Sequence, residues 1–137
     1  MELTRAGAQE SMRGNSAYFT GSVWLDRIVQ APAPARVRAL RVSFEPGART
    51  AWHTHPLGQT LHVLTGCGLF QTEGQGAIVI RPGDTIWIPP GEKHWHGAGP
   101  TTTMVHIAIQ EGGDAGETNW LEQVSEADYQ AAGASAG

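Results

Sequence analysis

The chain of 137 residues contains one cysteine, few aromatic side chains and no long run of apolar residues. The lone cysteine, Cys67, cannot form a disulfide within the chain, which fits a reducing compartment. No segment approaches the apolar length that a membrane helix needs, and residues 1–9 lack the apolar stretch of a signal peptide. We therefore expect a cytoplasmic protein.

Positive charge is also scarce, because 9 Lys and Arg face 13 Asp and Glu, for a formal net charge of −4. Proteins that bind nucleic acid or anionic membranes usually carry a basic patch, so we expect neither of these partners. The expected partner is a small-molecule substrate.

Glycine and proline, by contrast, are plentiful, with 18 and 8 residues. They separate short runs of β-branched and aromatic residues, a pattern typical of an all-β sandwich or barrel. The runs predict strands at 18–29, 36–44, 50–55, 60–64, 68–72, 77–80, 84–88, 93–97 and 102–110. The length suits a single domain, which we place at residues 16–131 after an N-terminal arm at 1–15. Ser125 and Asp128 predict a helix start, so a short helix should end near residue 131, before a disordered tail at 132–137.

Two histidines separated by one residue, His53 and His55, point to a metal site. Side chains alternate between the two faces of a strand, so both imidazoles lie on one face. Gln59 shares their parity and could reach the same point after the turn at residues 56–58, and His94 supplies a third imidazole from far along the chain. Three imidazoles and one amide oxygen suit a divalent transition metal and leave coordination positions open for a substrate.

Parity also sorts the neighbours of these residues. If Gln59 faces inward, then Leu61 and Val63 do too, and His62 faces outward. Trp52 and Trp95 alternate with the histidines and should be structural aromatics on the outer face. The expected apolar lining of the pocket comprises Leu40, Val42, Phe44, Leu61, Val63, Met104 and Ala108.

The last predicted strand has two partly apolar faces, one with His106 and Gln110 and the other with an Ile/Val stripe. The pattern alone does not decide which face is inside. We take the polar pair as pocket residues, with His106 as the acid–base catalyst and Gln110 beside it, and expect the stripe to pack on a second sheet or subunit. His96 shares the parity of His94. It either orients a ligand imidazole, the role we assign to it, or lies at the pocket rim.

The spacing around these residues resembles two motifs of the cupin superfamily. Gly47, five residues, His53-x-His55, three residues, Gln59, six residues and Gly66 resemble the first motif. Gly83, five residues, Pro89-Pro90-Gly91, two residues and His94 resemble the second. The stretches 44–61, 66–68 and 90–98 further resemble small bacterial cupins that include manganese-dependent hydroxynitrile lyases.

The resemblance implies a double-stranded β-helix barrel that holds one divalent metal through His53, His55, Gln59 and His94, with His106 as acid–base residue. Manganese is the first candidate, and iron, nickel or zinc are alternatives. The implied activity is cleavage and formation of cyanohydrins, and the alternatives are a metal-dependent dioxygenase or a non-enzymatic small-molecule-binding cupin. Small cupins typically pair their sheets, so we expect a homodimer or homotetramer.

Two positions depart from the usual cupin pattern. Most metal-binding cupins have Glu where this chain has Gln59, and the second motif commonly ends in Asn where this chain has Ala98. A neutral fourth ligand leaves more positive charge on the metal, which strengthens it as a Lewis acid. The same change disfavours the higher oxidation states of iron or manganese, and thus favours acid–base chemistry over oxidation.

Overall fold

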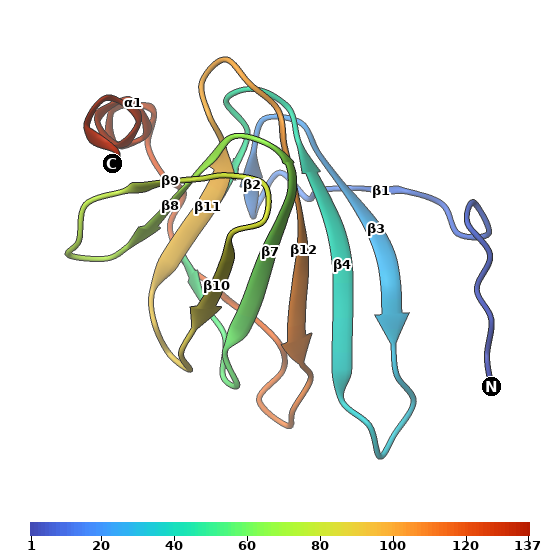
Figure 1. The fold of residues 1–137 in the computed structure, drawn as a ribbon. Coiled ribbons are helices and arrows are strands. Elements are labelled where there is room, and N and C mark those ends of the chain that lie inside the picture. Colours follow the sequence, from blue (N-terminus) through green and yellow to red (C-terminus); the bar gives the residue numbers. More distant parts are fainter.

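The computed structural model describes residues 1–137 as two β-sheets that face each other, with one helix outside them (Figure 1). The first sheet has six antiparallel strands in the order β1-β3-β4-β12-β7-β10. Their bounds are Met12–Arg13 (β1), Val23–Gln30 (β3), Val37–Phe44 (β4), Met104–Glu111 (β12), Gln59–Gly66 (β7) and Thr85–Ile88 (β10).

The second sheet contains seven shorter strands, of which five follow the order β13-β6-β11-β5-β2, while β8 joins β11 to β9. Their bounds are Asn119–Trp120 (β13), His53–Thr54 (β6), His94–Ala98 (β11), Arg49–Thr50 (β5), Phe19–Thr20 (β2), Gly68–Thr72 (β8) and Ile78–Ile80 (β9). The all-β prediction is confirmed. The predicted strand over residues 50–55 is divided into β5 and β6, and the short strands β1 and β13 were not predicted.

Side chains alternate along the strands, so that one face of a strand points into the space between the two sheets. In β7, Gln59, Leu61 and Val63 are buried, whereas Thr60 and His62 are half-buried on the other face. His62 hydrogen-bonds Thr85 of β10 there, as its parity predicts. The main core joins both sheets and consists of Val23, Val42, Phe44, Ala48, Leu61, Val63, Phe70, Ile80, Ile88, Ala98, Met104 and Ala108.

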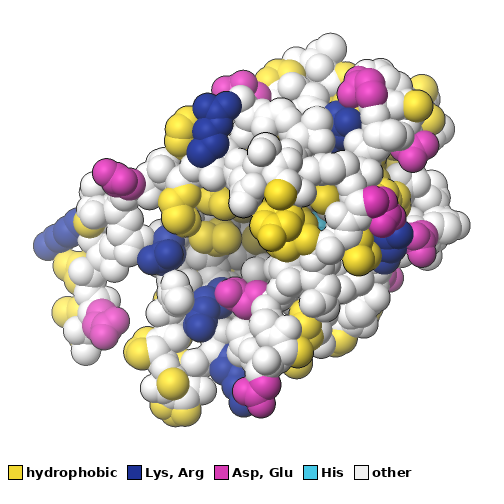
Figure 2. All heavy atoms as spheres, turned by 180° about the vertical axis from the view of Figure 1, so that it is seen from behind, with side chains coloured by type: hydrophobic (Ala, Val, Ile, Leu, Met, Phe, Trp, Pro, Cys, Tyr) yellow, Lys and Arg dark blue, Asp and Glu magenta, His cyan; other side chains and the backbone are white.

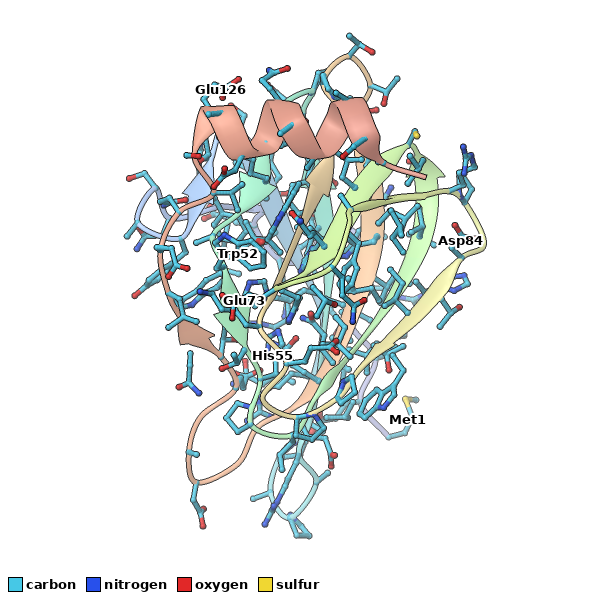
Figure 3. All side chains as sticks on the ribbon, turned by 90° about the vertical axis from the view of Figure 1, so that its left-hand side faces the viewer. Met1, Trp52, His55, Glu73, Asp84 and Glu126 are labelled. Atoms are coloured by element: carbon cyan, nitrogen blue, oxygen red, sulfur yellow. The ribbon has the colours of Figure 1, made fainter.

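The helix α1 (Glu126–Ser135) covers the outer face of the second sheet (Figure 3). Ser125 caps it by accepting a hydrogen bond from the Asp128 N–H at 3.1 Å, as the sequence predicted. Beneath the helix, Tyr129 donates to the Ala98 carbonyl at 2.6 Å and packs against Trp95, which is therefore a structural aromatic. No helix in the structure is both long and apolar enough to cross a membrane.

The prediction of a disordered tail from residue 132 is wrong. The helix continues to Ser135, because alanine favours helix and Ala132 is buried against the same cluster as Trp95 and Tyr129. The final residue, Gly137, then pairs with β9 by accepting from the Val79 N–H at 2.8 Å. Part of the N-terminal arm also belongs to the first sheet, because Met12 and Arg13 pair with β3.

Candidate active site

Three predicted metal ligands meet on the inner face of the second sheet. His53 and His94 lie directly opposite each other on β6 and β11, with ring centroids 4.2 Å apart. His55 follows β6, and its ring lies 5.0 Å from that of His53 and 5.4 Å from that of His94. All three side chains are buried, in the part of the barrel away from α1, where Figure 3 marks His55.

Each of these rings is anchored by its Nδ1 nitrogen to a backbone carbonyl. The partners are Ala51 for His53 at 2.8 Å, Glu117 for His55 at 2.7 Å and Glu92 for His94 at 2.8 Å. A carbonyl only accepts, so Nδ1 must carry the hydrogen and Nε2 of the neutral ring is left with its lone pair. This is the tautomer in which histidines that bind metals are usually held by their second hydrogen bond.

Gln59, on the opposite sheet, presents a fourth ligand atom, which is an oxygen. Its Nε2 donates to Oε1 of Gln110 at 2.7 Å, while its own Oε1 is buried without a hydrogen-bond partner. The Nε2 atoms of His55 and His94 are likewise buried and unpartnered. Buried polar atoms normally find partners, so these orphaned acceptors fit a bound cation.

His96 is closer to this group than the sequence indicated. Ligand nitrogens of His53, His94 and His96 lie within 4.8 Å of one another, so His96 is buried beside the predicted metal ligands rather than at the pocket rim. The parity that His96 shares with His94 is the sequence signal for this position. Its Nδ1, however, lies 2.9 Å from Nε2 of His106 and is therefore engaged in a second contact.

The bond between His96 and His106 joins the two sheets, because His96 belongs to β11 and His106 to β12. His106 is fully buried, so the open question of which face of β12 is inside is decided in favour of the polar pair. The remaining nitrogens, Nε2 of His96 and Nδ1 of His106, have no hydrogen-bond partner. Phe44 supports both rings, with centroid distances of 6.1 Å to His96 and 5.4 Å to His106.

Burial keeps the cluster uncharged. Loss of solvation lowers the pKa of all five buried imidazoles, to about 4 for His94 and His106. Repulsion from neighbouring histidines adds to this effect for His53 and His96. At neutral pH the rings are therefore neutral, able to donate a lone pair to a cation or to accept a proton.

A cavity of about 280 Å³ opens beside the histidines, and its walls include His53, His55, Gln59, His96, His106 and Gln110. Leu40, Val42 and Ala108 supply apolar lining, as predicted. Phe44, Leu61, Val63 and Met104 do not line the cavity, contrary to expectation. They face inward, but they fill the core, where side chains from both sheets leave no open space.

The outer part of the cavity is formed by residues that the sequence did not single out. Trp120 of β13 stacks on Tyr18 with a centroid distance of 4.7 Å, contacts Phe19 at 5.6 Å and lies 4.8 Å from the His53 ring. Met12 and Arg13 of the N-terminal arm complete the wall. In Figure 2, hydrophobic side chains gather near the centre of the rear face, and a histidine is visible between them. Arg13 is the only charged side chain in the lining and no carboxylate is present, so the cavity suits a partly apolar ligand without positive charge.

Comparison with known proteins agrees with this architecture. The profile of the cupin domain family matches residues 40–109, which include every residue of the two motifs. The chain belongs to the cupin family. It is 56% identical over 129 residues, 94% of this chain and 98% of the relative, to a protein from Granulicella tundricola named (R)-mandelonitrile lyase.

Two further relatives of this cupin are informative. A cupin-like protein from Thermotoga maritima has 41% sequence identity and a TM-score of 0.86, with 90% of this chain and 94% of that chain covered. An acireductone dioxygenase from Picosynechococcus is 36% identical over 63 residues, which cover 43% of this chain and 36% of the relative. The similarity to the lyase therefore spans the whole site and that to the dioxygenase only part of the chain.

Proposed function

We propose that this cupin is a metal-dependent lyase that cleaves cyanohydrins into an aldehyde and hydrogen cyanide, and forms them in the reverse direction. The observation that carries the proposal is the similarity, across almost the whole chain, to a protein named for mandelonitrile cleavage. A cavity without carboxylates, with partly apolar walls and unpaired imidazole nitrogens, suits such a neutral, partly apolar substrate.

For the metal, we propose a divalent transition ion held by His53, His55, Gln59 and His94. The unpartnered acceptors and the Nδ1 anchors described above support this set, and the resemblance to manganese-dependent lyases favours manganese over iron, nickel or zinc. When bound, the cation would supply a Lewis acid beside the substrate hydroxyl. Gln59 is neutral, so the protein adds no negative charge that would weaken this effect.

His96 and His106 would move the proton during cleavage. An unpaired ring nitrogen of the pair accepts the hydroxyl proton, and the electrons of the O–H bond form the carbonyl of the aldehyde. The C–C bond breaks and its electrons leave with cyanide. The two histidines then return the proton to cyanide, which gives hydrogen cyanide. The low pKa of both rings keeps them neutral before the reaction, and proton transfer of this kind contributes about 10²–10⁴-fold to a rate.

The rest of the substrate would occupy the apolar part of the cavity. Leu40, Val42 and Ala108 limit the depth available to an aryl or alkyl group, and the stacked pair of Tyr18 and Trp120 offers an aromatic surface near the opening. Aromatic rings gain from offset stacking with one another, so aryl cyanohydrins should be preferred over small aliphatic ones.

The test combines metal analysis with a cyanide assay. The purified protein is analysed for bound elements, stripped with a chelator and reloaded separately with Mn, Fe, Ni or Zn, and cyanide release from mandelonitrile is measured for each form. We expect turnover that disappears on stripping and returns on reloading. His62→Ala is the control variant, since this histidine faces outward and should leave activity unchanged. Absence of cyanide release from every loaded form would contradict the proposal.

A second candidate is a metal-dependent dioxygenase, which the partial similarity to acireductone dioxygenase favours. The same cavity could hold an enolate-like substrate together with oxygen. Oxygen consumption by the iron- or nickel-loaded form with such substrates, in the absence of cyanohydrin cleavage, would favour this alternative over the lyase.

A further inference from the structure

Glu117 contacts one of the proposed metal ligands, His55, directly and is linked to a second, Gln59, through Gln110. It lies in the loop between β12 and β13, at the same end of the barrel as the loop between β3 and β4 (Figure 1). Its backbone carbonyl accepts the hydrogen of His55 Nδ1 at 2.7 Å. Its carboxylate accepts from Nε2 of Gln110 at 3.4 Å, and Gln110 in turn accepts from Gln59.

The direction of these hydrogen bonds follows from the carboxylate. A side-chain amide can face a neighbour with either its oxygen or its NH2 group, so the bond between Gln59 and Gln110 could run either way. A carboxylate only accepts, which obliges Gln110 to turn its NH2 group to Glu117 and its oxygen to Gln59. Gln59 must then give its NH2 group to Gln110 and point Oε1 into the site.

Arg38 forms an ion pair with the other oxygen of the Glu117 carboxylate, without a hydrogen bond. Its Nε lies 3.9 Å from Oε2 of Glu117, and the Glu117 side chain is 39% exposed. A carboxylate can accept from Gln110 with one oxygen and attract the guanidinium of Arg38 with the other at the same time. An amide at this position could not, because an oxygen turned to the guanidinium would leave the NH2 group facing Gln110.

We propose that Glu117 is a positioning residue, which sets the orientation of the Gln110 and Gln59 amides so that Gln59 offers its oxygen to the metal. The proposal rests on the metal site proposed above. In this proposal, Gln110 links the ion pair of Glu117 and Arg38 to the ligand Gln59 through its two hydrogen bonds. A reversed Gln59 would present an NH2 group, which cannot bind a cation.

The first variant is Glu117→Gln. The oxygen of the new amide should face Arg38, so its NH2 group should donate to Gln110. This reverses the direction of the hydrogen bonds and turns the NH2 group of Gln59 into the site. We expect metal affinity, measured by competition with a chelator, to fall about tenfold, the effect that the free energy of one hydrogen bond produces. Asp114→Asn is the matched control, because it removes one negative charge from the same loop at an exposed side chain without a hydrogen bond.

The second variant is the exchange Gln110→Glu with Glu117→Gln, which keeps the net charge of the wild type. The carboxylate at position 110 can accept from Gln59 and from the amide at position 117 together. The original direction of the hydrogen bond from Gln59 to residue 110 is thereby restored, and we expect metal affinity within about threefold of wild type. A merely structural role of Glu117 predicts no such rescue.

Orientation can be read without metal by NMR of the metal-free protein. Only the NH2 group carries protons, so nuclear Overhauser contacts from the Gln59 NH2 group should go to Gln110 in the wild type and in the exchange variant. In Glu117→Gln they should go to the imidazole protons of the site. Unchanged contacts together with unchanged metal affinity in Glu117→Gln would overturn the proposal. If neither the wild type nor any variant binds metal, the proposed metal-dependent function fails. The NMR contacts then still decide the orientation of the Gln59 amide.

Discussion

Replacement of His106 by asparagine tests the proposed chemistry most directly. An alanine would not be informative, because His106 is fully buried and its Nε2 lies 2.9 Å from His96 Nδ1. Removal of the ring would open a cavity and leave a buried nitrogen unpaired, at a cost of about 1–3 kcal/mol for the lost partner alone. A loss of activity could then be a loss of folding.

Asparagine retains a polar group that can hydrogen-bond His96 but cannot take up and return a proton. In His106→Asn we therefore expect full metal content, a melting temperature lowered by only a few degrees and cyanide release from mandelonitrile reduced by two or more orders of magnitude. The size of this reduction follows from the loss of a general acid–base group, worth about 10²–10⁴-fold.

The assay measures all three quantities on one preparation, with His62→Asn as the control. His62 lies on the adjoining strand opposite Ile107, faces outward and should tolerate the change. Turnover of His106→Asn within a few-fold of wild type, at full metal occupancy, would refute the role of His106 in proton transfer.

Three other predictions concern the metal ligands, pH and assembly. If the proposed ligand set is right, His55→Ala should lose stoichiometric metal in elemental analysis, whereas His96→Ala should retain it and lose turnover; the reverse would place His96 among the ligands. Acid should destabilise the metal-free protein, because a pKa lowered in the fold means that the unfolded chain binds more protons below pH 6.5; for His106, whose pKa is about 4, the free energy of unfolding should fall by roughly 3 kcal/mol between pH 6.5 and pH 4. The measurement is a melting temperature that falls over this pH range. We also expect self-association through the outer face of the six-stranded sheet, where the exposed Ile109 and Trp87 flank Thr60; Ile109→Asp should shift the mass measured by light scattering towards the monomer, and a wild type that is monomeric at micromolar concentration would contradict this.

The sequence by itself determined which residues face inward. Alternation along a strand is a local property of the backbone, so His53 and His55 could be assigned to one face and His62 to the other without any knowledge of tertiary structure. Glycine and proline marked the turns for the same local reason, and the motif spacing then identified the cupin barrel. Ser125 gave the helix start because a cap depends on neighbours three residues away.

Only the tertiary structure decided which inward residues meet, since parity specifies a face but not the depth along the barrel. His96 and His106 come from different sheets, and their contact depends on how the two sheets pack. Phe44 and Met104 have the parity of pocket residues, yet they lie where the core is filled. Glu117 belongs to an irregular loop without periodicity, so no pattern could predict that its carboxylate would reach Gln110.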